Sequence, residues 1–181
     1  MRFPSVTEVI SAHSDFSMVP PDVLNLACQR GSDVHELCAL YAQKLWIPDI
    51  PVNLAGYFQS FKLWYDQFVE EVILVEGELR DEELQYCGHP DFIGRLKGDA
   101  GLILIDWKTA AALSKIWRLQ VAGGYRGLAE KNGYPITRVA SLRPQKDGKP
   151  AKFQEYYRTM AYDLSIFLAE LSVWRFFHAA G

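Results

Sequence analysis

Apolar side chains recur at helical spacing along the first third of the chain. Ser5 to Glu8 has the pattern of a capping box, which predicts a short helix beginning there. Residues 20–46 predict one helix, a break near Gly31 and a second helix, and residues 54–69 predict a further aromatic-rich amphipathic helix. The apolar positions of the second helix are Val34, Leu37, Leu40 and Tyr41.

From about residue 71 the pattern changes to the two-residue period of β-strands. Residues 71–80, 84–97 and 101–109 predict three consecutive strands. The elements predicted after them are a helix over 111–131, a strand over 134–144, a turn over 145–150 and a long helix over 153–177. This order predicts a single domain, residues 1–181, of the α/β (α+β) class, in which helices flank a small, mixed, largely antiparallel sheet.

The second and third strands form a predicted hairpin whose open end carries charge. Alternation places Asp106 and Lys108 on the face of Leu102 and Leu104, opposite Ile103, Ile105 and Trp107. Closing the turn at residues 97–102 predicts a register in which Asp91 lies opposite Lys108 and Asp106 lies opposite Ile93. Asp91 and Asp106 are then diagonal neighbours, roughly 5–8 Å apart at Cβ. Two carboxylates this close repel unless a cation lies between them.

Such a constellation suits hydrolysis of a phosphate ester. A hard divalent cation prefers carboxylate oxygens and water, and it makes a bound water more acidic. Lys108 beside it can orient that water or stabilise charge on the phosphate oxygens. The alternative is a hairpin end that faces solvent and carries an ordinary cross-strand Asp–Lys ion pair.

Four motifs in order resemble the PD-(D/E)XK nuclease superfamily, in its RecB-like and phage-type exonuclease branch. Pro90-Asp91 followed by Asp106-Trp107-Lys108 resembles the motif that names the superfamily. The segment "RGSDVHELCALY" resembles the branch's first motif, "WRLQVAGGY" its helix after the lysine, and "FPSVTEVI" the start of phage members. The resemblance runs from about residue 4 to 125.

The resemblance implies a restriction-endonuclease-like core and a role for each motif residue. Asp91 is implied as the central metal ligand, with Asp106, the main-chain carbonyl of Trp107 and His35 completing the shell. One or two Mg²⁺ or Mn²⁺ ions are the implied cofactors, because an imidazole ligand suits Mn²⁺. Lys108 is implied to act on the water and the transition state, and Gln120 to position Lys108 or the substrate.

The sequence departs from the family pattern on the helix after the lysine. Members commonly have a tyrosine four residues after the glutamine, whereas here that position is Gly124 and the tyrosine is Tyr125. A regular helix turns Tyr125 about 140° away from the face of Gln120. Either the helix is distorted at Gly123-Gly124, or the role of that tyrosine is lost or moved. Relatives that contain an iron–sulfur cluster have C-terminal cysteines. No cysteine follows Cys87 here, so we expect no iron–sulfur cluster.

Several of these residues have a structural alternative. His35 has the pattern of a histidine at a boundary between helix and core, Gln120 that of an exposed helix residue, and Glu76 that of a member of an ion pair. Glu76 also resembles a glutamate found in phage relatives before the aspartate motif. Tyr125, Trp117 and Arg118 suit either core packing or DNA contact. The basic segment 143–152, which includes the predicted turn, has Arg143, Lys146 and Lys149 as candidates for contact with the DNA backbone, or is an ordinary solvated loop.

The composition says more about the cellular location of the protein than about its chemistry. The chain has 181 residues, 49% hydrophobic and 23% charged, without an apolar run long enough for a membrane span or a signal core. Three scattered cysteines, without a C-x-x-C pair, argue against a disulfide framework or a structural zinc site. We therefore expect a cytoplasmic protein. Residues 1–91 carry a net charge of −10 and residues 92–181 a net charge of +7, so a basic groove is compatible with the total of −3.

The leading hypothesis is a metal-dependent DNA nuclease, more specifically an exonuclease of phage or bacterial recombination or repair. Its partner would be DNA, either single-stranded or at duplex ends, and a homo-oligomer or a recombination partner protein stays open. The alternatives are a catalytically silent nucleic-acid-binding module of the same fold and a structure-specific endonuclease such as a junction resolvase.

Overall fold

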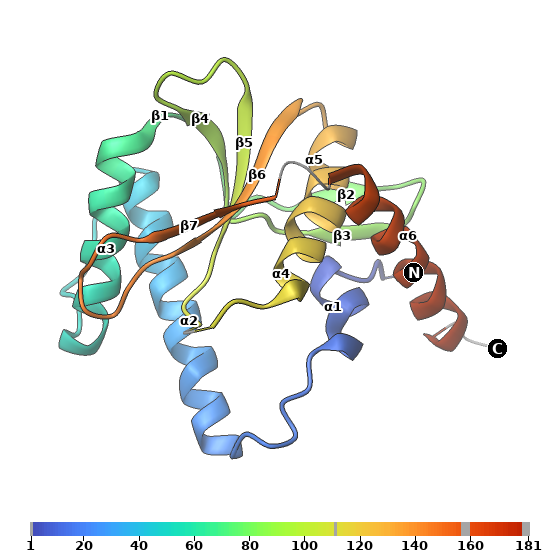
Figure 1. Cartoon of the computed structure of the whole chain (residues 1–181), viewed down its shortest axis with the longest axis horizontal. Helices are drawn as coiled ribbons and strands as arrows, with labels where there is room; N and C mark the ends of the chain where they lie inside the picture. The colour runs from blue at the N-terminus through green and yellow to red at the C-terminus, as the bar shows by residue number, and fades with distance from the viewer. Residues whose placement is uncertain (1, 111, 157–159, 179–181) are drawn as a thin grey trace.

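A five-stranded sheet lies at the centre of the structure, between two groups of helices (Figure 1). The computed structural model describes residues 2–110, 112–156 and 160–178. The helical elements are α1 (Val6–Ile10), η1 (Ser11–His13), α2 (Pro21–Ala42), α3 (Val52–Phe68), α4 (Lys115–Arg118), η2 (Leu119–Tyr125), α5 (Arg126–Lys131) and α6 (Met160–His178). The strands are β1 (Val69–Val75), β2 (Leu79–Asp81), β3 (Tyr86–Gly88), β4 (Phe92–Leu96), β5 (Leu102–Trp107), β6 (Ile136–Arg143) and β7 (Lys152–Glu155).

The strand order in the large sheet is β1-β4-β5-β6-β7. The β5–β6 pair is parallel, whereas the other three pairs are antiparallel. The chain connects β5 to β6 through α4, η2 and α5, because parallel neighbours need a crossover. The predicted fold class, a mixed and largely antiparallel sheet flanked by helices, is confirmed.

Each face of the sheet has its own hydrophobic core. Ile103, Ile105 and Trp107 pack with α2 and α3, whereas Leu104 packs with α1, η2 and α6 on the other face. Figure 1 shows α2 and α3 to the left of the sheet, and α4, α5 and α6 to its right. The predicted alternation along β5 is therefore confirmed. None of the described helices is long and apolar enough to cross a membrane.

The predicted break near Gly31 is wrong, because α2 runs continuously from Pro21 to Ala42. A glycine inside a helix costs about 1 kcal/mol relative to alanine. The part of α2 after Gly31 buries Val34, Leu37 and Cys38 against the sheet and α3. This burial outweighs the cost of the glycine, since each buried aliphatic side chain contributes about 1.5–3 kcal/mol.

Four other predicted elements differ from the elements in the structure. The predicted strands 71–80 and 84–97 each split in two, and their inner parts, β2 and β3, pair with each other as a separate small sheet. The predicted helix 153–177 begins instead as the strand β7, and α6 starts at Met160. The predicted helix 111–131 first becomes helical at Lys115, and its predicted start at residue 111 lies outside the described residues.

The predicted hairpin register is wrong by two residues. Phe92 pairs with Ile105 and Gly94 with Ile103, because the loop between β4 and β5 spans all of residues 97–101. Continued by one residue, this register places Asp91 beside Asp106 rather than opposite Lys108. An even shift leaves every side chain on its predicted face. The two carboxylates are therefore cross-strand neighbours instead of diagonal ones.

Candidate metal centre and its lysine

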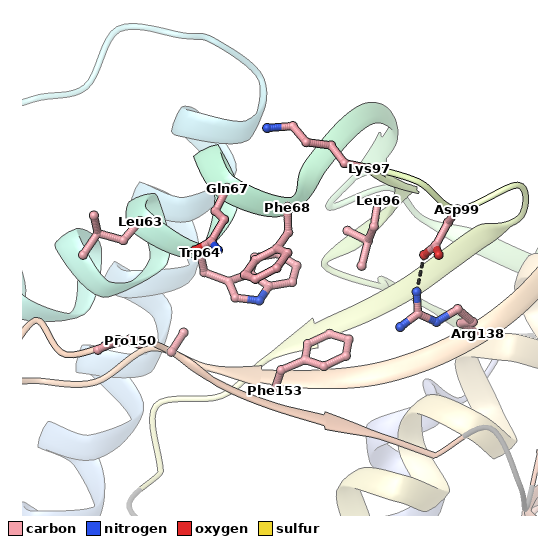
Figure 2. A pocket seen from close by; sticks show the side chains of 11 residues that line it. Leu63, Trp64, Gln67, Phe68, Leu96, Lys97, Asp99, Arg138, Pro150 and Phe153 are labelled. Atoms are coloured by element: carbon pink, nitrogen blue, oxygen red, sulfur yellow. Dashed lines mark hydrogen bonds and ion pairs between the residues drawn. The ribbon is translucent and has the colours of Figure 1, made fainter.

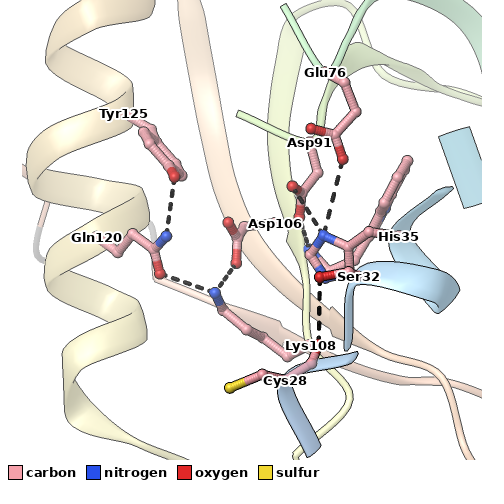
Figure 3. Close-up of polar contacts among 10 residues, drawn as sticks. Cys28, Ser32, His35, Glu76, Asp91, Asp106, Lys108, Gln120 and Tyr125 are labelled. Carbon is pink, nitrogen blue, oxygen red and sulfur yellow. Dashed lines mark hydrogen bonds and ion pairs between the residues drawn. The ribbon is translucent and has the colours of Figure 1, made fainter. Parts of the chain in front are cut away.

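The predicted site residues meet at one end of the sheet, where β4 begins and β5 ends (Figure 3). Helix α2 reaches this end from one face of the sheet and η2 from the other, and the bend after β1 reaches it from the edge. The residues that gather there are His35, Glu76, Asp91, Asp106, Lys108, Gln120 and Tyr125.

Asp91 is held firmly at the centre of this group. Its side chain is buried, and its Oδ2 accepts a hydrogen bond of 2.5 Å from the main-chain N–H of Trp107. Its Oδ1 lies 3.3 Å from Nδ1 of His35. The Trp107 ring packs edge-on against both His35 and Phe61, which fixes the end of β5. The main-chain carbonyl of Trp107 as a metal ligand stays a prediction.

His35, Glu76 and Asp91 form a group that could hold a metal ion. One ligand atom from each residue lies within 4.8 Å of the others, and Nδ1 of His35 is 3.9 Å from the Glu76 carboxylate. One imidazole and two carboxylates are donors that suit Mn²⁺ and Mg²⁺. The residues present therefore fit the cofactor that the sequence predicts. Asp106 directs Oδ2 at Lys108 instead, and its role as a ligand stays a prediction.

Glu76 joins this group through an unusual backbone conformation. Its φ is 50°, in the left-handed region that non-glycine residues seldom adopt. Its main-chain N–H donates to the carbonyl of Asp91 at 3.1 Å, which ties the bend after β1 to the start of β4. Backbone strain of this kind costs about 1–3 kcal/mol and concentrates at functional sites. The Glu76-Gly77 pair at the end of an apolar strand is the sequence signal that could have indicated this bend.

Lys108 begins a chain of polar contacts that runs into η2. Its Nζ lies 2.5 Å from Oδ2 of Asp106 and donates to Oε1 of Gln120 at 2.8 Å. The Gln120 amide in turn donates to the hydroxyl of Tyr125 at 3.0 Å. Gln120 is buried rather than exposed. The amine of Lys108 is therefore held between an acid and an amide (Figure 3).

The helix that follows Lys108 is distorted, which is the first of the two alternatives that the sequence left open. Residues Leu119–Tyr125 form a π-helix, and the N–H of Arg126 bonds to the carbonyl of Val121, five residues earlier. Residues five apart share a face in this geometry, so Tyr125 lies on the same face as Gln120. A Cβ on Gly123 would come 2.7 Å from the Asp163 carbonyl, and one on Gly124 would come 2.4 Å from Val6. The two glycines therefore let α6 and α1 pack against the distorted turn.

The electrostatics of the group reflect an excess of negative charge. Burial alone would lower the pKa of His35, but the charge of Asp91, its hydrogen bond and the charge of Asp106 raise it to about 9. Burial and the charge of Asp91 raise the pKa of Glu76 to about 7. Burial also raises the pKa of Asp106 to about 6, against the opposing charge of Lys108. A divalent cation would compensate this charge and favour the ionised carboxylates.

The predicted DNA-binding residues lie outside this group and mostly have partners. Arg118 forms an ion pair with the buried Asp163, with its Nε 2.7 Å from the carboxylate. Arg143 is buried, with its guanidinium 5.9 Å from the centre of the Trp117 ring. Lys149 pairs with Asp147 at 2.8 Å, and Lys146 is exposed on the same turn. Their contact with DNA stays a prediction.

Two cavities adjoin the group, one on each side. The first, of about 630 Å³, reaches Lys108 and Gln120, and the second, of about 460 Å³, reaches His35 and Glu76. A third cavity, of about 670 Å³, lies at the opposite end of β4 and β5, between Trp64 and Phe68 of α3 and Phe153 of β7 (Figure 2). It contains none of the predicted site residues.

Comparisons with known proteins leave the family open. No model of a protein family matches the sequence. A search of curated proteins likewise finds no match.

Proposed function

We propose that this protein is a divalent-metal-dependent DNA nuclease that hydrolyses phosphodiester bonds. The observation that carries the proposal is that a ligand atom from each of His35, Glu76 and Asp91 lies within 4.8 Å of the others, at the end of the sheet where Lys108 follows β5. A group of metal ligands next to a positioned amine combines the two requirements of phosphate-ester hydrolysis, an activated water and compensation of charge on the phosphate. Mg²⁺ or Mn²⁺ is the proposed cofactor.

Each residue of the proposed site has a distinct role. A bound cation supplies Lewis-acid stabilisation and lowers the pKa of a coordinated water. The main-chain N–H of Trp107 holds Oδ2 of Asp91, which leaves Oδ1 beside His35 to face a cation. Lys108 presents its amine to the phosphate oxygens or to the attacking water, and Asp106 and Gln120 together fix the position of that amine.

The test is cleavage of end-labelled single-stranded and duplex DNA by the purified protein with Mg²⁺, Mn²⁺ or EDTA. Asp91→Asn and Lys108→Met should each lower the cleavage rate by roughly a hundredfold or more, in the range that removal of one preorganised stabilising group costs. Asp49→Asn is the matched control, because Asp49 is exposed and lies on the loop between α2 and α3. Equal residual signals from wild type and Asp91→Asn would contradict the proposal.

The form of the products assigns the class of nuclease. Mononucleotides or short fragments released from DNA ends support the proposed exonuclease. Cutting of covalently closed circular DNA selects the endonuclease instead. DNA binding that survives EDTA, without cleavage in any metal, selects the catalytically silent module.

A further inference from the structure

The cavity beside Lys108 has two walls that come from distant parts of the chain. One wall is the end of α1 with the connection to α2, including Ile10 and Phe16. The other consists of residues on either side of the start of α4, including Leu113 and Trp117. Gln120 and the amine of Lys108 lie in the lining, so the cavity opens directly onto the proposed reaction centre.

The lining is mainly apolar, although the centre that it adjoins is charged. Ile10 and Trp117 are buried in the inner wall, while Phe16 and Leu113 are 53% and 57% exposed. An exposed aromatic and an exposed leucine in the lining of a cavity are features of a ligand site. Ser14 adds a hydroxyl group to the lining, and the hydroxyl of Ser11, which donates to the Glu8 carbonyl at 2.7 Å, can still accept a hydrogen bond. This combination suits a flat aromatic ring with polar edges, not a phosphate.

The cavity on the other side of the group differs in charge. Its lining has two acids, Glu36 and Glu76, and one histidine, His35, whereas the lining of the first cavity has one acid, Asp15, together with Lys108 and His13. The phosphate of a nucleic-acid strand is therefore favoured more on the side of Lys108. The strand is therefore expected to leave the metal group toward Phe16 and Leu113.

We propose that the cavity lined by Phe16, Leu113 and Trp117 binds the base of an unpaired nucleotide next to the scissile phosphate. The inference rests on the proposed function for the position of that phosphate. A volume of about 630 Å³ is that of a small-molecule site, too small for a base pair with both of its backbones. The substrate is accordingly a single strand or a frayed end, read with little sequence preference because every base offers an aromatic face.

Binding of DNA without cleavage tests the base pocket directly. The probes are a fluorescein-labelled short oligothymidylate and the same backbone with abasic residues, measured by anisotropy in Ca²⁺ buffer. The wild type should bind the abasic probe about five- to a hundredfold more weakly, the range for loss of stacking on one aromatic side chain. Equal affinity for both probes, or no affinity for either, overturns the base pocket.

Two variants assign the effect to this cavity. Phe16→Ala and Leu113→Ala should each weaken binding of the oligothymidylate about three- to tenfold and leave binding of the abasic probe unchanged. Met18→Ala is the matched control, because Met18 is 92% exposed on the same connection and outside the lining. An equal loss in all three variants, or no loss in any, overturns the assignment. Thermal melting confirms that each variant is folded.

The same oligonucleotides in Mn²⁺ separate this inference from the proposed function. Equal cleavage of the oligothymidylate and the abasic oligonucleotide supports the proposed nuclease and refutes the base pocket. Base-dependent binding without cleavage keeps the pocket and refutes the nuclease.

Discussion

At the scale of single residues, Glu76 combines a strained backbone with an unfavourable charge. Its φ of 50° and its proximity to Asp91 both disfavour the folded, metal-free protein. The folded pKa of about 7 lies above the ordinary value of 4.5, so the folded state binds the proton more tightly than the unfolded state. The resulting cost is absent below about pH 4.5, grows between the two pKa values and is complete above about pH 7.

We therefore expect Glu76→Gln to raise the melting temperature of the metal-free protein at about pH 8, and to raise it less at about pH 5. Differential scanning fluorimetry in EDTA measures both values. Glu78→Gln is the control, and we expect it to change the melting temperature in the opposite direction. Glu78 is exposed, and its hydrogen bond with Arg80 lowers its pKa. A Glu76→Gln variant that melts below wild type at the higher pH would show that the carboxylate stabilises the metal-free fold.

His35 gives a second prediction at this scale. Its pKa of about 9 means that its imidazole is protonated near neutral pH before a metal binds. Coordination requires neutral imidazole, so binding must displace a proton. We expect Mn²⁺ binding at about pH 7.5 to release roughly one proton, and the affinity to rise with pH until about pH 9.

Calorimetric titration in two buffers with different ionisation enthalpies measures this proton directly. His35→Ala should lose most of the buffer dependence together with most of the affinity. The exposed His178, at the end of α6, offers the control His178→Ala, which should titrate like the wild type. Binding without proton release would place the metal away from His35.

At the scale of elements, the π-helix is the feature that connects the core to the site. It lets Tyr125 support Gln120, which in turn holds Lys108. One hydrogen bond contributes about 0.5–1.5 kcal/mol, equivalent to a factor of roughly 2 to 12 in rate if the whole effect falls on the transition state. Tyr125 therefore acts through Gln120 and is a positioning residue.

We expect Tyr125→Phe to lower kcat for DNA cleavage by roughly two- to tenfold with little change in KM, because the ring remains and only the hydroxyl bonded to Gln120 is lost. Steady-state cleavage kinetics measure this effect. Tyr86→Phe is the matched control, since the Tyr86 hydroxyl contacts the Gly124 carbonyl of the same π-helix but none of the contacts of Lys108. A similar fall in kcat for both variants would indicate a general loosening of η2.

At the scale of the whole molecule, the proposed ion would connect segments that are far apart in the chain. His35 comes from α2, Glu76 from the bend after β1 and Asp91 from the start of β4. A ligand that binds the folded state alone stabilises it by about 2.7 kcal/mol when its free concentration is about 100 times its Kd. For a chain of this size that corresponds to a rise of roughly 5–10 °C in melting temperature.

We expect saturating Mn²⁺ to produce a rise of this size in wild type and almost none in Asp91→Asn, as measured by thermal melting with and without EDTA. Asp49→Asn serves again as the control and should respond like the wild type. An equal response to Mn²⁺ in wild type and Asp91→Asn would mean that the ion binds elsewhere.

The sequence by itself determined the features that depend on short stretches of chain. The coarse succession of helices, strands and helices and the alternation of faces along β5 follow from local periodicity, and the choice of Asp91, Asp106 and Lys108 as candidates follows from motif. Each of these is set by neighbours a few residues away, and hydrophobic patterning reports on such neighbours well.

The tertiary structure alone decided the features that require contact between distant segments. The hairpin register depends on how the loop at residues 97–101 closes, and the left-handed bend at Glu76 depends on the hydrogen bond to Asp91. The choice of a π-helix at Gln120 to Tyr125 depends on α1 and α6 packing against its glycines. Local propensity is nearly indifferent among these alternatives, so packing between elements selects one of them.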